Sequence, residues 1–364
     1  MYKRSGIFGL LLLIAIGVAG LFGNEFANAQ QSEPKSPVAT PTPPIEEEDA
    51  VVKVETESVN VLFTAQDRSR KLILTLKPED IRILENGQPQ VISAFSRQID
   101  LPLSLAILID TSASQERTLP EEKSAAISFL ESVIRPEKDE VSVISFTGES
   151  TLEQGMTSNM QRLRRSIERV TFVPPSGYLG GGVVTNGGRT PGTPPISGTN
   201  QQIQGSTAIW DSIFVTSSDV LGPAPERTRR AIILLSDGYD TFSKKKLDDA
   251  VQAALRAEAV IYSVGIGDNF YDGVDEGSLK KISERTGGRA YFPRDENELR
   301  QAFKQIQDEM RSQYLVAYEP TNRALDGSFR KIEIQLVNTE LEKQKVRVSH
   351  RQGYFAKTAA PAKK

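Results

Sequence analysis

Two apolar runs that each end in polar residues restrict the fold of this chain more than any other feature. Residues 103–109 (LSLAILI) carry no charge, and Asp110 follows them directly. A second run, 231–235 (AIILL), leads in the same way to a serine and then Asp237. Such runs are typical of strands buried inside a parallel sheet, which deliver polar groups at their carboxyl ends. The sequence therefore predicts a parallel sheet with two aspartates at one end.

The rest of the middle region alternates between helical and strand-like periodicity. Helical spacing of apolar residues is found at 126–133, 160–170, 209–220, 245–258, 279–282 and 299–310. Strand-like runs are found at 141–146 and 260–265, and we expect 151–156 to form an antiparallel edge strand. Thr118 and Glu121 have the spacing of a capping box at the start of the first helix. This alternation predicts a doubly wound α/β domain with a mainly parallel sheet and right-handed crossovers.

In a sheet with the strand order 3-2-1-4-5-6, the strands that end in the two aspartates are neighbours at the point where the order reverses. Ligands of open α/β sheets bind at that point. Ser112 and Ser114 follow Asp110, and Thr207 opens the third helix. Together with Asp237 they offer carboxylate and hydroxyl oxygens, which suit a hard divalent cation that keeps some of its waters. The alternative interpretation is that the aspartates only cap helices or turns and hold no metal.

The elements D-x-S-x-S, G-x-T and S-D-G, in this order, resemble the metal-ion-dependent adhesion site of a von Willebrand factor type A domain. The resemblance implies that Ser112, Ser114 and Thr207 contact Mg²⁺ (or Mn²⁺ or Ca²⁺) directly. It also implies that Asp110 and Asp237 act largely through water. With few anionic ligands the cation stays electrophilic, so the resemblance further implies that it accepts a Glu or Asp carboxylate from a protein partner.

The segments on both sides of residues 101–311, which the resemblance covers, show the period-two alternation of β-strands. Strands are expected at 51–63, 72–76, 81–84, 90–95, 314–318, 329–337 and 346–349, with a hairpin turn at Asn86-Gly87. Each flank alone is too small to form a stable fold. We therefore infer that 51–100 and 312–356 pair into one β-sandwich, with the α/β domain inserted between them and 357–364 as a tail.

This plan resembles that of integrin β chains, in which a type A domain is inserted into a sandwich. Residues 84–90 (LENGQPQ) and 353–355 (GYF) are also similar to segments that flank the type A domain in a group of exported bacterial proteins. Because most proteins of that group are uncharacterised, this similarity supports the architecture rather than a particular ligand.

The amino terminus has the pattern of an export signal. Two basic residues precede the sixteen uncharged residues 7–22, and Ala27-Asn28-Ala29 forms a small-x-small cleavage site. Residues 1–29 are therefore predicted to be a signal peptide, and the protein is expected to be periplasmic or extracellular. An uncleaved membrane anchor is the alternative, although a span needs ~17–25 apolar residues. Residues 30–50, with five prolines and an acidic run, are predicted to form a semi-extended linker.

A segment rich in glycine and proline precedes Thr207. Residues 174–205 contain nine glycines and five prolines. Loops of this length inside compact domains are either functional or disordered, and both interpretations stay open. Gly180-Gly181-Gly182 is not followed by Gly-Lys-Ser/Thr, so a phosphate-binding P-loop is not supported. Tyr178 and Arg189 are the candidate ligand-contacting side chains of this segment.

Composition argues against several other functions. The 364 residues include no cysteine, which excludes disulfides and thiolate metal sites, and the net charge of −3 argues against a nucleic-acid partner. The single histidine, His350, lies in a strand-like segment. Haloacid dehalogenase-type phosphatases carry a second aspartate where this chain has Ser112. We therefore expect a binding module for an acidic protein partner and not an enzyme. A Mg²⁺-dependent hydrolase and a scaffold with a purely structural metal are the alternatives.

Overall fold

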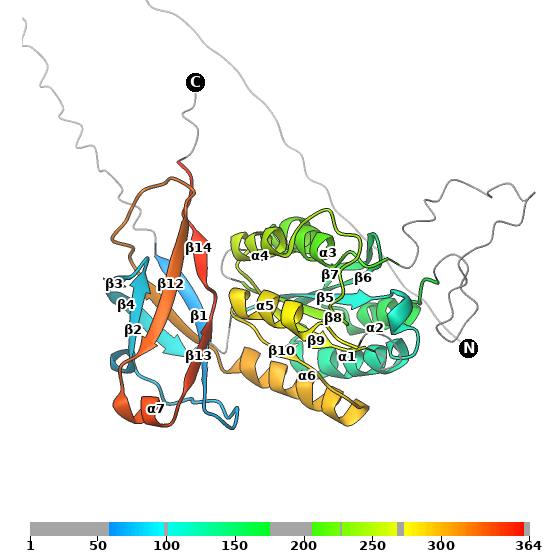
Figure 1. Ribbon diagram of the computed structural model, residues 1–364, viewed down its shortest axis with the longest axis horizontal. Helices are drawn as coiled ribbons and strands as arrows, with labels where there is room; N and C mark the ends of the chain where they lie inside the picture. Colours follow the sequence, from blue (N-terminus) through cyan, green and yellow to red (C-terminus); the bar gives the residue numbers. More distant parts are fainter. Residues whose placement is uncertain (1–57, 98–100, 175–205, 226–227, 268–272, 360–364) are drawn as a thin grey trace, which may run out of the picture. The chain divides into compact units, whose positions relative to one another are not determined.

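The structure of the chain is a computed structural model (Figure 1). It describes residues 58–97, 101–174, 206–225, 228–267 and 273–359. The predicted signal peptide 1–29, the predicted linker 30–50, and the segment with Tyr178 and Arg189 lie outside the described residues.

The α/β domain contains a six-stranded sheet in the order β10-β9-β8-β5-β6-β7. Its strands are β5 (Leu103–Asp110), β6 (Glu140–Phe146), β7 (Ser150–Thr157), β8 (Arg229–Ser236), β9 (Ala259–Gly265) and β10 (Ala290–Tyr291). All neighbouring strands are parallel except β6 and β7, which are antiparallel. Counted along the chain, this is the predicted order 3-2-1-4-5-6, with β5 and β8 as neighbours.

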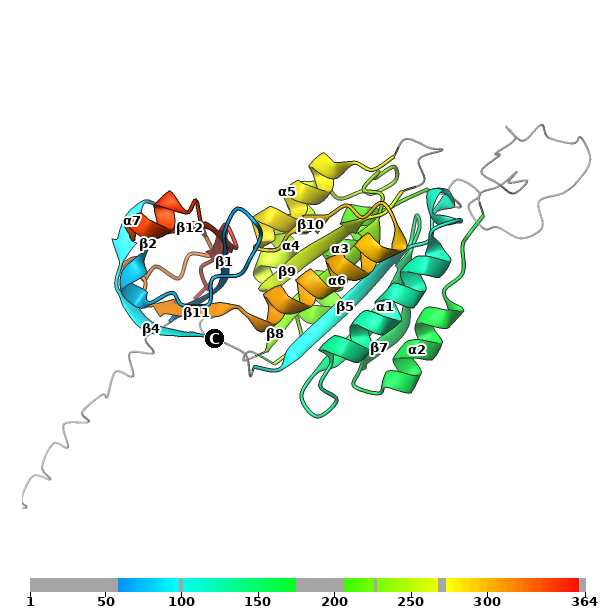
Figure 2. The same ribbon diagram turned by 90° about the horizontal axis from the view of Figure 1, so that it is seen from below.

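Helices cover both faces of this sheet (Figures 1 and 2). They are α1 (Leu119–Val133), α2 (Met160–Arg169), α3 (Ile209–Val215), α4 (Leu247–Arg256), α5 (Glu276–Thr286) and α6 (Glu296–Arg311), with a 3₁₀ turn η2 (Ala113–Gln115) and a π-helical turn η3 (Thr216–Leu221). Helices α1, α2 and α6 pack on one face with Leu105 and Ile107, and α3, α4 and α5 on the other with Ala106 and Leu108. Every residue of β5 is buried as a result, which explains its uninterrupted apolar run.

The flanking segments form two four-stranded sheets, β13-β1-β11-β4 and β14-β12-β2-β3. Their strands are β1 (Val59–Gln66), β2 (Ile81–Glu85), β3 (Gln88–Gln90), β4 (Ile92–Arg97), β11 (Tyr314–Tyr318), β12 (Phe329–Leu336), β13 (Arg347–His350) and β14 (Gly353–Phe355). Strand β1 lies between β11 and β13, and β2 lies between β12 and β3. Strands from before and after the α/β domain thus alternate in the first sheet, and in the second sheet they meet at the pair β12 and β2. The predicted fold class, an α/β domain inserted in a β-sandwich, is confirmed.

Some local predictions in the sandwich hold and others fail. Asn86 and Gly87 both have positive φ (49° and 81°) and form the predicted tight turn between β2 and β3. Residues 72–76 form no strand and contribute one isolated bridge, Gln66 to Leu72. The strand expected over 90–95 is divided, because β3 pairs in one sheet and β4 crosses to the other. The 3₁₀ turn η1 (Pro78–Asp80) and the helix α7 (Thr339–Lys343) were not predicted.

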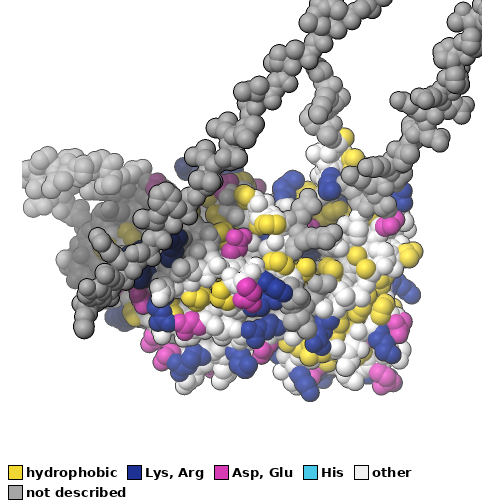
Figure 3. Space-filling model, turned by 180° about the vertical axis from the view of Figure 1, so that it is seen from behind, with side chains coloured by type: hydrophobic (Ala, Val, Ile, Leu, Met, Phe, Trp, Pro, Cys, Tyr) yellow, Lys and Arg dark blue, Asp and Glu magenta, His cyan; other side chains and the backbone are white. Residues whose placement is uncertain are grey.

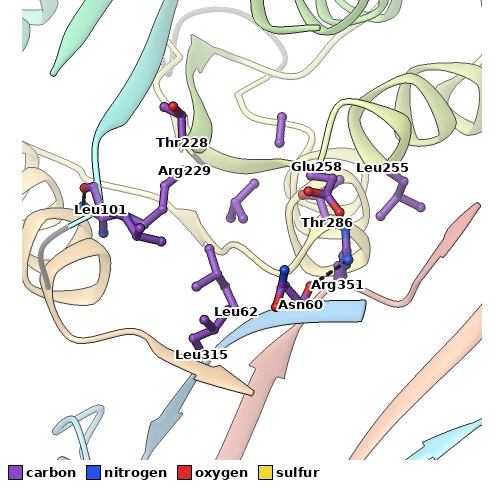
Figure 4. Close-up of a pocket in the computed structure, with 12 residues that line it drawn as sticks. Asn60, Leu62, Leu101, Thr228, Arg229, Leu255, Glu258, Thr286, Leu315 and Arg351 are labelled. Atoms are coloured by element: carbon purple, nitrogen blue, oxygen red, sulfur yellow. Dashed lines mark hydrogen bonds and ion pairs between the residues drawn. The ribbon is translucent and has the colours of Figure 1, made fainter. Parts of the chain in front are cut away.

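The sandwich contacts the α/β domain at the amino ends of β5, β8 and β9. Arg351 donates hydrogen bonds to the carboxylate of Glu258 and to the carbonyl of Asn60, both at 2.8 Å. A cavity of about 240 Å³ lies beside this contact (Figure 4), and Leu62 of β1 and Leu101 before β5 also line it. The sandwich therefore lies at the end of the sheet opposite to Asp110 and Asp237.

The surface carries charges of both signs. Figure 3 shows one face of the molecule, on which basic and acidic side chains are interspersed and neither sign forms a continuous area. Among the described residues, no helix has the length and apolar character needed to cross a membrane.

Candidate metal centre

The register of the central strands brings Asp110 and Asp237 to the same end of the sheet. In the parallel pair β5 and β8, Ile109 lies opposite Leu235. Asp110 is therefore beside Ser236, and Asp237 is one residue further along its strand. Asp110 is fully buried and Asp237 is only 4% exposed.

The Asp110 carboxylate is held in place by two hydrogen bonds. One oxygen accepts from the Ser112 amide at 2.9 Å, and the other accepts from the Ser236 hydroxyl at 2.6 Å. Burial, together with repulsion from Asp237, raises the pKa of Asp110 to about 7. Burial also raises the pKa of Asp237, and the Ser114 hydroxyl opposes that rise. Two buried carboxylates that repel each other form a place where a bound cation is favourable.

The two predicted serine ligands lie side by side. Their hydroxyl oxygens are 3.2 Å apart, and the turn η2 begins directly after Ser112. The 3₁₀ turn that begins at Ala113 turns the chain back, so that the Ser114 hydroxyl lies beside that of Ser112.

Backbone hydrogen bonds of Thr207 and Ala208 position this segment at the carboxyl end of the sheet. The Thr207 amide donates to the Thr241 hydroxyl at 2.9 Å, and its carbonyl accepts from the amides of Thr241 and Phe242. The next amide, of Ala208, donates to the Thr147 carbonyl at the end of β6 at 2.7 Å. Because β6 and β8 lie on either side of β5, this segment is placed beside the end of β5. All five predicted metal residues therefore come to the carboxyl end of the sheet.

Asp240 positions the helix that follows Thr207. One of its carboxylate oxygens accepts hydrogen bonds from the amides of Ile209 and Trp210 and from the Ser243 hydroxyl. These amides belong to the first turn of α3, where backbone donors lack partners within the helix. Asp240 therefore acts as a cap supplied by a distant segment.

Sequence reasoning missed three polar residues of this region. The first is Ser236, which is the serine of the S-D-G element and could have been predicted from that motif. Gln115 is fully buried, and its amide nitrogen donates to the Ile266 carbonyl at 3.1 Å. Its amide oxygen accepts from the Thr118 hydroxyl at 2.9 Å. The predicted capping box is therefore wrong, since Thr118 caps no backbone amide of α1. The third, Glu122, is fully buried in the first turn of α1.

The donor set fits a hard divalent cation. Among the described residues, no three side chains of His, Cys, Asp or Glu converge closely enough to hold an ion by themselves. Binding at this place therefore depends on the hydroxyl oxygens as well as on the two carboxylates. An all-oxygen set with neutral members suits Mg²⁺, which keeps several of its waters when bound.

The comparison with protein families agrees with this geometry. Residues 105–190 match a family model described as the von Willebrand factor type A domain, and residues 196–305 match a second model with the same description. Together they span β5 to α6, the whole inserted domain. The chain belongs to the von Willebrand factor type A domain family. A comparison with curated proteins found no match.

Solved structures with a similar fold include two kinds of protein. Proximal thread matrix protein 1 from the mussel byssus is 14% identical, with a TM-score of 0.44 over 59% of this chain and 49% of that one. The present chain thus spans about half the length of that protein. A further structure of the mussel protein, with a zinc-occupied MIDAS motif, is 15% identical with a TM-score of 0.42 (59% and 49%). An aerotolerance-related membrane protein from Bacteroides fragilis is 17% identical, with a TM-score of 0.40 (57% and 100%). At these identities the likeness concerns the fold alone.

Proposed function

We propose that this protein is an exported module that binds a protein partner in a metal-dependent manner, and that it is not an enzyme. The observation that supports the proposal is that two buried carboxylates and the adjacent hydroxyls of Ser112 and Ser114 lie at the carboxyl end of the sheet, with the backbone of Thr207 beside them. When bound there, Mg²⁺, or Mn²⁺ or Ca²⁺ in its place, supplies an electrophilic position that accepts a carboxylate oxygen from the partner.

The residues around the centre divide this work by charge. Asp110 and Asp237 supply two negative charges, whereas Ser112, Ser114 and Thr207 supply neutral oxygens. If the hydroxyls are the direct ligands and the two carboxylates act through water, no anion touches the cation directly, so the cation still attracts an acidic side chain of a partner. Tyr239 follows Asp237 by two residues and is 38% exposed, which makes an aromatic surface available beside the site.

The hydrolase alternative has less support. His350 is held within the sandwich, where one ring nitrogen accepts from the Ile334 amide and the other is 2.7 Å from the Arg351 carbonyl. It belongs to β13, on the opposite side of the domain from Asp110. Ser112 and Ser114 therefore have no histidine base near them among the described residues.

Export is proposed because residues 1–29 have the pattern of a signal peptide. The partner is proposed to be a protein rather than a nucleic acid because the net charge of the chain is negative.

The test is the capture of a partner from the exporting organism, followed by surface-plasmon measurement of its binding. We expect binding in Mg²⁺, loss of binding in EDTA, and recovery when Mg²⁺ is restored. Thr207→Ala should weaken binding at least about tenfold, because one direct oxygen is removed. Thr151→Ala, an exposed threonine on β7, is the matched control and should leave binding unchanged.

Binding that persists undiminished in EDTA would place the recognition surface elsewhere, most simply on the sandwich. In that case the scaffold alternative, with a structural metal, would be the better description. Hydrolysis of a phosphate ester that requires Mg²⁺ and Asp110 would favour the enzyme alternative.

A further inference from the structure

Glu122 interrupts the apolar stripe of α1. The residues of this helix that face the core are Leu119, Glu122, Ala125, Ala126, Phe129, Leu130 and Val133. All of them except Glu122 are apolar, yet Glu122 is fully buried. It lies in the first turn of the helix, which directly follows the loop that carries Ser112 and Ser114.

The Glu122 carboxylate has no hydrogen-bond partner on either of its oxygens. The hydroxyl that could reach it belongs to Thr118, but the proton of that hydroxyl is given to the Gln115 amide oxygen at 2.9 Å. A buried carboxylate without hydrogen bonds is strongly unfavourable unless an opposite charge is present.

The other two buried glutamates of the described residues are fully engaged. Glu85 accepts hydrogen bonds from the hydroxyls of Tyr318 and Tyr354 and forms an ion pair with Arg330. Glu309 accepts from the hydroxyl of Tyr291 and from the side-chain amide of Gln66. Glu122 is thus the exception among them, so its lack of partners calls for a group that the protein chain itself does not supply.

The charges that act most strongly on Glu122 are negative. Burial raises the pKa of Glu122 to about 8, and repulsion from Asp110 and Asp237 adds to this rise, while the Thr118 hydroxyl opposes it. Three acidic side chains therefore share one buried region at the carboxyl end of the sheet. A region of this kind is stable with its acids ionised only when a cation is present.

We propose that Glu122 is a third carboxylate of the metal centre, which acts on the cation from outside its direct ligands. Direct ligation is not part of the proposal, because no three acidic side chains of the described residues converge on one point. Glu122 is a positioning residue in this role. It would add negative charge near the cation and would offer its two unpartnered oxygens to water molecules bound to the cation. The inference deepens the proposed function and rests on metal binding by the site.

The test uses isothermal titration of the full chain with Mg²⁺. Glu122→Gln removes the charge and keeps the size of the side chain, and we expect it to weaken Mg²⁺ binding by about tenfold or more. Glu121→Gln is the matched control, because Glu121 is exposed in the same helical turn, and its affinity should equal that of the wild type. Thermal unfolding without metal supplies a second readout. At a pH above about 8, where Glu122 is ionised without metal, the melting temperature of Glu122→Gln should be equal to or above that of the wild type, since an unpartnered charge is removed.

A merely structural role for Glu122 predicts the opposite pattern, a lower melting temperature without metal and an unchanged Mg²⁺ affinity. If Glu122→Gln does not fold, Glu122→Met, which fits the apolar stripe, replaces it in the same measurement. Wild-type affinity in the variant that folds overturns the inference, as does failure of both variants to fold. Absence of Mg²⁺ binding by the wild type overturns the proposed function itself, so the two failures are distinguishable.

Discussion

At the scale of single residues, the candidate metal centre lowers the stability of the metal-free fold, because it buries carboxylates. Asp110 is fully buried, and its hydrogen bonds from Ser112 and Ser236 offset only part of the cost of that burial. Its pKa is raised from 3.8 to about 7. Between those two values the folded protein holds a proton that the unfolded chain has lost. The stability of the metal-free protein therefore falls as the pH rises through this window.

Asp110→Asn should remove this dependence. Without metal, the wild type should melt at a higher temperature at pH 5 than at pH 8, and the variant should show a smaller difference. At pH 8 the variant should be more stable than the metal-free wild type by on the order of a few kcal/mol, because no charge is buried. Its Mg²⁺ binding should be lost at both pH values.

Thermal melts at several pH values, with EDTA and with Mg²⁺, check this prediction. Asp219→Asn, at an exposed position of η3, is the control and should keep the wild-type behaviour. A variant that is less stable than metal-free wild type at pH 8 would show that the Asp110 charge is compensated within the chain.

At the scale of elements, α3 is held in place by a residue outside it. Asp240 caps the amides of Ile209 and Trp210, and the segment that carries Thr207 enters the helix directly before them. Loss of a capping side chain costs about 1 kcal/mol. Asp240→Ala should therefore lower the free energy of unfolding by about that amount. It should also weaken Mg²⁺ binding by up to about tenfold, because Thr207 is held less firmly.

Denaturant unfolding and Mg²⁺ titration of this variant check both effects. Asp240→Asn keeps an acceptor oxygen and should behave nearly as the wild type. If Asp240→Ala binds Mg²⁺ as tightly as Asp240→Asn does, the position of Thr207 does not depend on the cap.

Sequence patterns predicted correctly those elements whose apolar residues are spaced by contact with the core. The uninterrupted run of β5 and the helical stripe of α6 both reflect contact with a packed core, and both were located correctly. Thr118 was misjudged because its hydroxyl has an alternative acceptor, Gln115, that only the folded loop supplies. The division at 90–92, where the chain passes from one sheet to the other, leaves no trace in local periodicity.

The candidate site was predictable from the sequence where its residues belong to motifs, and not where a residue is buried only by packing. Asp110, Thr207 and Asp237 belong to motifs whose order along the chain is informative, and the structure places them at one end of the sheet. Glu122 escaped prediction because acidic residues are common in the first turn of helices, where they favour the helix dipole and usually face solvent. Only the packing of α1 on the sheet shows that it is buried.

At the scale of the whole molecule, buried polar contacts join the two halves of the sandwich. Glu85 of β2 accepts hydrogen bonds from Tyr318 of β11 and Tyr354 of β14 and pairs with Arg330 of β12. Three partners from after the inserted domain therefore satisfy one carboxylate from before it. Removing the partners would leave that charge buried and unpaired, which is costly. The amino-terminal strands are therefore expected to fold only together with the carboxyl-terminal strands.

The inserted domain depends less on the sandwich, because its buried Glu309 accepts from Gln66 of β1 but also from Tyr291 within the domain. Arg229, at the start of β8, donates hydrogen bonds to the carbonyls of Leu101 and Met310, so the first and last residues of the domain are held together from within. A fragment of residues 101–311 should therefore fold alone and show a cooperative melt. A fragment of residues 51–100 should not, because β1 and β4 pair only with strands from 312–356 and β2 keeps only its hairpin with β3. Mixing the second fragment with residues 312–356 should restore β-structure, measured by circular dichroism.

The split-sandwich architecture would be wrong if the fragment 51–100 melted cooperatively by itself. A fragment 101–311 that bound Mg²⁺ as the full chain does would show in addition that the metal centre needs nothing from the sandwich.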